Sequence, residues 1–114
     1  MSVKISKRDV GGITVVDLSG RLTLGDASAL LRETLRELLT QGQKKIVLNL
    51  GQVGYIDSSG LGELVSGFTT VKNQGGQLKL ANLTQKVNDL LTITKLYTVF
   101  EVHNDEQAAV QSFR

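Results

Sequence analysis

The hydrophobic residues near the N-terminus follow the two-residue period of β-strands. Apolar and polar residues alternate at the start of VKISKRDV (residues 3–10), and a second apolar stretch, ITVVDL (residues 13–18), ends at a Ser-Gly pair (residues 19–20). The glycine pair at residues 11–12 lies between them, and such pairs adopt the positive φ angles of tight hairpin turns. The pattern therefore predicts an N-terminal β-hairpin.

The next segment has the hydrophobic period of a helix, and the one after it has the pattern of a strand. From Asp26 to Gln41 the apolar residues recur every three or four positions, which predicts one amphipathic helix. Asp26 is the expected N-cap and Gly42 the expected left-handed C-terminal stop. The run KKIVLNL that follows, bounded by Gly51, is apolar on both faces, which is typical of a strand in a sheet covered by helices.

The remaining segments continue to alternate between helix and strand. We expect a helix from residue 58 or 59 to NQGG (residues 73–76), a strand at QLKLAN (residues 77–82), a helix capped by Thr84, a strand at YTVFEV (residues 97–102) and a helix capped by Asp105. This order predicts an α/β fold with a mixed central sheet of about five strands, an N-terminal hairpin at its edge, and about four helices.

The composition of the chain argues against several classes of function. A chain of 114 residues with 40% hydrophobic and 21% charged residues fits one globular domain, residues 1–114. The net charge of +2 and the 4% aromatic content do not give the basic stripe and stacking platform of a nucleic-acid-binding protein. There is no cysteine and His103 is the sole histidine, so we expect neither a metal site nor a cofactor.

The sequence also lacks membrane signals. The first ten residues contain no uninterrupted apolar core of a signal peptide, and no apolar run approaches the ~20 residues that span a bilayer. We expect a cytoplasmic protein without membrane contact, and the absence of cysteine agrees with this location.

The stretch YIDSSGLGELV (residues 55–65) carries the candidate chemistry. It follows a predicted buried strand and begins a predicted helix, so its two serines lie at a helix N-terminus, where free backbone N–H groups favour an anion. Three interpretations compete: Asp57 or Ser58 caps the helix, a serine is a catalytic nucleophile, or a serine is a phosphorylation switch.

Catalysis has the weakest support of the three. The sequence IDSSGLG lacks the glycine that stands two residues before the serine in a hydrolase elbow, and nothing in the sequence brings His103 near Ser58. Without an oriented base a serine hydroxyl is a poor nucleophile. We therefore assign no catalytic residue and expect a protein that is not an enzyme.

A phosphorylation switch fits the location. A phosphate at a helix N-terminus adds about −1.5 to −2 charges without disrupting the helix, so its effect falls on a docking partner. The small residues Gly60, Gly62, Ser66 and Gly67 leave room for another backbone, although close packing within the fold explains them equally well.

These residues resemble a known family. IVLNLGQVGYIDSSGLGELV, followed by VKNQGGQLKLANL and LLTITKLYTVFEV, is similar to the STAS domain of bacterial anti-sigma factor antagonists, from about Ile5 to Phe113. The resemblance implies that an anti-sigma factor, itself a serine kinase, phosphorylates Ser58. It implies further that only the unphosphorylated form binds this kinase and releases a sigma factor, and that a serine phosphatase restores that form.

The resemblance also implies a docking surface. Asp57, Ser59, Gly60 and Leu61 would frame the switch, and Ser59 is a second candidate phosphoacceptor. The alternative is a STAS module without a switch, serving as a scaffold or binding a nucleotide or other small ligand, in which Ser58 only caps the helix.

Two segments depart from the family pattern. Well-studied antagonists tend to carry an acidic residue where this chain has GRLTLGDAS, with Arg21 and Thr23 in the segment that contacts the kinase. Many relatives have glycine where this chain has Lys95, so we expect strain at Lys95 if the site needs a positive φ.

Overall fold

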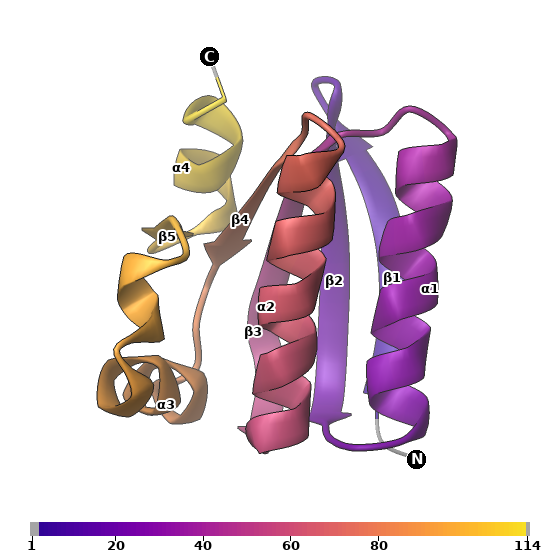
Figure 1. The fold of residues 1–114 in the computed structure, drawn as a ribbon. Helices are drawn as coiled ribbons and strands as arrows, with labels where there is room; N and C mark the ends of the chain where they lie inside the picture. Colours follow the sequence, from indigo (N-terminus) through magenta and orange to yellow (C-terminus); the bar gives the residue numbers. More distant parts are fainter. Residues whose placement is uncertain (1–2, 114) are drawn as a thin grey trace.

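The computed structural model describes residues 3–113, which form one sheet with helices on both faces (Figure 1). The strands are β1 (Val3–Val10), β2 (Ile13–Leu22), β3 (Lys45–Ile56), β4 (Gln77–Ala81) and β5 (Val102–His103). The helices are α1 (Asp26–Thr40), α2 (Ser58–Asn73), α3 (Gln85–Thr94) and α4 (Glu106–Gln111), with a 3₁₀ turn, η1, at Leu96–Thr98.

The strand order in the sheet is the order in the sequence. β1 and β2 pair antiparallel, whereas β2, β3, β4 and β5 pair parallel. Helical crossovers join the parallel strands, and this arrangement needs both faces of the sheet to be covered. The predicted mixed sheet with an edge hairpin and four helices is confirmed.

Alternate side chains of the strands enter two separate cores. Ile46 and Leu48 of β3 lie in the larger core, together with buried residues of α1, α2 and α3. Val47, between them in sequence, lies in the smaller core with Ala109 and Val110 of α4. The run that is apolar on both faces therefore reflects a strand buried on both faces, as predicted.

Several predicted helix ends are confirmed. Gly42 and Gly75 follow α1 and α2 with φ of 79° and 81°, which is left-handed backbone that glycine adopts without strain. Thr84 and Asp105 cap α3 and α4, because their side chains accept hydrogen bonds from backbone N–H groups three residues ahead.

Two strands run further than predicted. β2 continues through Gly20 to Leu22, and β3 continues through Gly51 to Ile56. The pairing of β2 with β3 shifts register twice, and the N–H of Gly51 turns to the side-chain oxygen of Asn49 at 3.1 Å. The glycines that were expected to end these strands therefore lie at irregularities inside them.

Two other predictions are wrong in detail. Asp26 is the first helical residue of α1, and the N-cap position is taken by Gly25, which makes no side-chain hydrogen bond. Most of YTVFEV (residues 97–102) is not a strand, because η1 occupies its start and β5 begins only at Val102. The apolar residues serve packing instead: Phe100 is buried and meets Phe68 edge to face, with ring centroids 5.5 Å apart.

Candidate functional site

The candidate site begins with Asp57, the residue between β3 and α2. Its extended backbone (φ −106°, ψ −177°) ends the strand, and its Oδ1 accepts a hydrogen bond from the N–H of Gly60 at 2.8 Å. Its Oδ2 accepts a second hydrogen bond from the N–H of Leu24 at 3.2 Å, in the loop between β2 and α1. Asp57 is therefore the N-cap of α2, and of the two residues proposed for this role Ser58 is not the cap.

The hydrogen bonds keep the Asp57 carboxylate ionised. The N–H of Gly60 lowers the pKa of this carboxyl below its ordinary value, with smaller contributions in the same direction from the N–H groups of Leu24 and Ser59. N–H groups that point at a carboxylate stabilise its charged form. A negative charge is therefore already present at the start of α2.

Ser58 and Ser59 follow this cap as the first two residues of the helix. Ser58 is exposed, and its hydroxyl makes no hydrogen bond within residues 3–113, whereas Ser59 is half-buried. Ser58 thus presents the more accessible hydroxyl of the pair. A modifying enzyme would reach it without opening the fold.

Gly60 and Leu61 face inward. Leu61 belongs to the larger core, and a Cβ atom added at Gly60 would lie 2.0 Å from the carbonyl oxygen of Leu22. Gly60 lets the first turn of α2 lie directly against the end of β2. Both residues therefore support the first turn of α2 from its buried side.

The other small residues of α2 divide between packing and exposure. A Cβ at Gly67 would lie 2.6 Å from Cδ1 of Leu35 in α1, so this glycine serves packing between helices. A Cβ at Gly62 would meet nothing within 4 Å, and Ser66 is exposed. Of the four small residues, Gly62 and Ser66 are open to solvent.

Two of the residues that depart from the family pattern, Arg21 and Thr23, lie at or just after the end of β2. Arg21 is exposed, and its guanidinium carbon lies 4.4 Å from the centroid of the Tyr55 ring. Thr23 is half-buried, and its carbonyl oxygen accepts a hydrogen bond from Oγ of Ser28 at 3.0 Å. The structure therefore places Arg21 opposite Tyr55 on the neighbouring strand, and Thr23 next to Leu24, whose N–H is bound to Asp57.

Sequence reasoning missed Leu24, Tyr55 and Lys86. Leu24 has 77% of its surface exposed although its N–H is bound to Asp57, and Nζ of Lys86 lies 5.3 Å from the centroid of the Tyr55 ring. For Leu24 a signal was present, because this leucine stands outside the apolar stripe of α1. Nothing in the sequence placed Lys86 beside Tyr55.

The sole histidine is engaged elsewhere. His103 lies on β5, which β4 separates from β3, and its Nε2 is 2.6 Å from Oε2 of Glu101. The structure therefore does not bring His103 to Ser58. Over residues 3–113 no group of three or more His, Asp or Glu residues is arranged to hold a metal ion.

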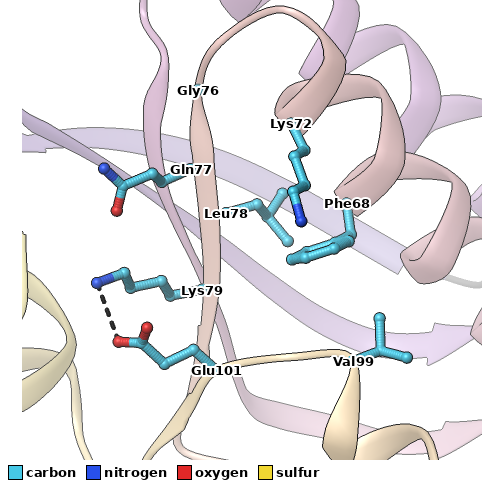
Figure 2. Close-up of a pocket in the computed structure, with 8 residues that line it drawn as sticks. All are labelled: Phe68, Lys72, Gly76, Gln77, Leu78, Lys79, Val99 and Glu101. Atoms are coloured by element: carbon cyan, nitrogen blue, oxygen red, sulfur yellow. Dashed lines mark ion pairs between the residues drawn. The ribbon is translucent and has the colours of Figure 1, made fainter.

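A hollow of about 240 Å³ lies at the outer edge of β4 (Figure 2). Phe68 and Lys72 of α2 line one side, and the ion pair between Nζ of Lys79 and Oε2 of Glu101, 2.9 Å long, lies on the other. A larger hollow of about 560 Å³ lies over the polar part of the sheet around Asp17. Ser58 lines neither of them.

Comparison with known proteins assigns the family. The family described as the STAS domain matches residues 4–109. The chain belongs to the STAS domain family. This STAS chain is 35% identical over 111 residues to the anti-sigma-B factor antagonist of Bacillus subtilis (strain 168), covering 97% of this chain and 96% of that protein.

Solved structures agree with this STAS assignment. A putative anti-sigma factor antagonist of Thermotoga maritima superimposes with a TM-score of 0.82 at 26% identity, covering 95% of this chain and 92% of that one. The Bacillus cell fate determinant SpoIIAA, in its phosphorylated form, gives a TM-score of 0.74 at 20% identity, covering 97% and 100%. The SpoIIAA likeness concerns the fold. Within the part of this STAS chain that the structure describes, no helix is long and apolar enough to cross a membrane.

Proposed function

We propose that this STAS protein is an anti-sigma factor antagonist in a partner-switching pathway. The unphosphorylated form binds an anti-sigma factor that is also a serine kinase, and this binding frees a sigma factor. Phosphorylation of Ser58 blocks the binding, and a serine phosphatase reverses the modification. The 35% identity with the anti-sigma-B factor antagonist of Bacillus subtilis over nearly the whole chain supports the antagonist role.

The geometry of Ser58 is the observation that supports a phosphorylation switch. Its exposed hydroxyl follows directly after Asp57, whose carboxylate already caps α2. Because the Ser58 hydroxyl makes no hydrogen bond within residues 3–113 and the cap is the Asp57 side chain, a phosphate on Ser58 leaves the cap in place. The N-terminus of α2 accommodates the added charge.

The consequence of phosphorylation falls on the partner. A phosphate at Ser58 adds about −1.5 to −2 charges beside the ionised Asp57. A protein surface that fits the neutral hydroxyl then meets extra bulk and a local charge of about −2.5 to −3 in place of the single charge of Asp57. We infer that binding is lost by this local repulsion, without a change in the fold.

The test uses the purified GHKL-type ATPase kinases of the source genome, added one at a time with ATP. We expect mass spectrometry to find phosphate on Ser58 of the wild-type chain, and no phosphate after Ser58→Ala. Ser59→Ala is the matched control and should leave phosphorylation intact. If Ser58→Ala is still phosphorylated at Ser59, the assignment of the acceptor is wrong.

Binding provides the second half of the test. Ser58→Glu should bind the kinase more weakly than the wild-type chain does. Calorimetry with ADP in place of ATP measures this affinity, because the kinase then cannot phosphorylate the wild-type chain. Thr69→Glu, which adds the same charge to an exposed position nearer the C-terminal end of α2, should bind as the wild-type chain does. If none of the kinases binds or phosphorylates the wild-type chain, the switch is refuted in favour of a STAS module with another role.

A further inference from the structure

Two cations lie against one tyrosine ring at the end of the sheet. The guanidinium carbon of Arg21 is 4.4 Å, and Nζ of Lys86 is 5.3 Å, from the centroid of the Tyr55 ring. The three side chains come from β2, α3 and β3 respectively, so only the folded chain brings them together. We call Arg21 and Lys86 the Tyr55 cation pair.

Neither member of the Tyr55 cation pair forms an ion pair with an acidic residue among residues 3–113. The ion pairs within residues 3–113 engage other cations, among them Lys7, Arg8 and Arg32. An aromatic ring attracts a cation only weakly at an exposed site, by roughly 0.5–1 kcal/mol, and it does not neutralise the charge. Two positive charges are therefore held at one place without an ion-pair partner among the residues that the structure describes.

The Tyr55 cation pair lies at the same end of the sheet as Ser58. Arg21 is directly opposite Tyr55 in the pairing of β2 with β3, and the next residues along β3 lead to the Asp57 cap and Ser58. Figure 1 shows the loop from β2 to α1, the start of α2, and α3 all at the lower end of the molecule. That loop carries Leu24, the exposed apolar side chain whose N–H is bound to Asp57.

Exposed cations without an ion-pair partner, at the same end of the sheet as an exposed leucine, are features of a protein interface. Charge complementarity across an interface steers association and selects the partner. We infer that the anti-sigma factor bound at this end of the sheet presents an acidic cluster to Arg21 and Lys86, and an apolar contact to Leu24. This inference rests on the proposed function, and it names the charge of the partner surface.

An acidic partner surface also explains how one phosphate separates the proteins. The same cluster that is attracted by the Tyr55 cation pair is repelled by the phosphate on Ser58, because like charges across an interface are strongly unfavourable. Attraction at Arg21 and Lys86 and repulsion at Ser58 then act on one acidic surface. The affinity of the partner then depends on the sum of the charges of Arg21, Lys86 and the phosphate on Ser58.

The test reverses the two charges and measures binding. We expect the Arg21→Glu, Lys86→Glu double variant to bind the kinase identified above about tenfold more weakly or worse in calorimetry. Lys44→Glu with Lys45→Glu is the matched control, because these exposed lysines lie at the start of β3, remote from Ser58, and the change in net charge is identical. The control variant should bind within about twofold of the wild-type chain.

Salt and neutral variants separate charge from shape. Wild-type affinity should fall as ionic strength rises, and the Arg21→Gln, Lys86→Gln variant should show a flatter salt dependence with an unchanged circular dichroism spectrum. The inference is overturned if the charge-reversed variant folds and binds as tightly as the wild-type chain. That result would leave the proposed function standing.

Two further outcomes would also overturn the inference. If no kinase binds the wild-type chain, the proposed function fails and the inference fails with it. If the chain alone forms dimers in sedimentation experiments, and reversal of the Tyr55 cation pair dissociates them, the occupant of this surface is a second copy of the chain. Both results are distinct from a loss of kinase binding in the charge-reversed variant alone.

Discussion

The side chain of Asp57 joins the N–H of Leu24, at 3.2 Å, to the first turn of α2. One carboxylate thus caps a helix and fixes the adjacent loop between β2 and α1. The loop carries an exposed leucine, and the helix carries the exposed Ser58. The two parts of the proposed docking surface are therefore held in register by a residue that lies between them.

Removal of this carboxylate should affect stability and binding together. Asp57→Ala loses the hydrogen bonds to Gly60 and Leu24, so we expect a lower Tm and weaker kinase binding. Asp57→Asn keeps an accepting oxygen for the cap and is the matched control, with a smaller fall in Tm. Equal Tm values for the alanine variant and the wild-type chain would contradict the assignment of Asp57 as the cap.

The contribution of Asp57 should depend on pH. Because the N–H of Gly60 and its neighbours lower the pKa of this carboxyl in the folded state, its ionised form stabilises the fold. This stabilisation is fully present above the ordinary aspartate pKa of about 3.9 and is lost as pH falls through the lower folded-state value. Urea unfolding of the wild-type chain and Asp57→Asn should therefore differ most at neutral pH and converge in acid.

If the stability difference between wild type and Asp57→Asn stays constant from neutral pH down to pH values well below the ordinary aspartate pKa, the carboxylate charge is not the stabilising group. Acid unfolding from other carboxylates affects both proteins and cancels in the comparison. Asp17, whose pKa is lowered mainly by its hydrogen bonds with Arg8, is one such group.

Two glycines of α2 should respond to alanine in opposite directions. Gly60→Ala places a Cβ against the carbonyl of Leu22 and should lower the free energy of unfolding by about 1–3 kcal/mol. Gly62→Ala meets open space in the same helix and should raise it by about 0.5–1 kcal/mol, because alanine favours helix more than glycine does. Chemical denaturation measures both, and a stabilising Gly60→Ala would contradict the close packing of α2 on β2.

Lys95 offers a test of backbone strain. Lys95 follows the last residue of α3 with φ of 63°, so this position does have the positive φ that would strain a residue with a side chain. Lys95→Gly should raise the free energy of unfolding by roughly 1 kcal/mol, because glycine adopts this conformation without a Cβ penalty. Lys95→Ala keeps the Cβ and should give no comparable gain, so equal effects of the two variants would contradict the strain.

Much of the fold could be predicted because its signals are local. The apolar period of α1, the doubly apolar run of β3 and the caps Thr84 and Asp105 depend on residues close together in sequence. The extension of β3 past Gly51 could not be predicted, because it depends on β2 lying alongside as far as Leu22. The short β5 likewise reflects the tertiary packing of Phe100.

The candidate site divides in the same way. The helix start at Ser58 and the choice of Asp57 or Ser58 as the cap followed from the sequence, but only the bond from Gly60 to Asp57 decides between them. The inward orientation of Gly60 and the stacking of Lys86 on Tyr55 involve elements more than 30 residues apart. Single-sequence patterns carry no information about such contacts.

The brevity of β5 has a consequence for how copies of this chain behave in concentrated solution. β5 pairs only with Leu80 and Ala81, so the outer edge of β4 before Leu80 has no neighbouring strand. Such an edge invites intermolecular strand pairing, which proteins resist by placing charges beside it. The buried Lys79 pairs at this edge with Glu101, whose side chain is half-exposed, so an added strand would have to strip water from the Glu101 carboxylate (Figure 2). The cost of burying this carboxylate opposes the pairing of a second chain at this edge.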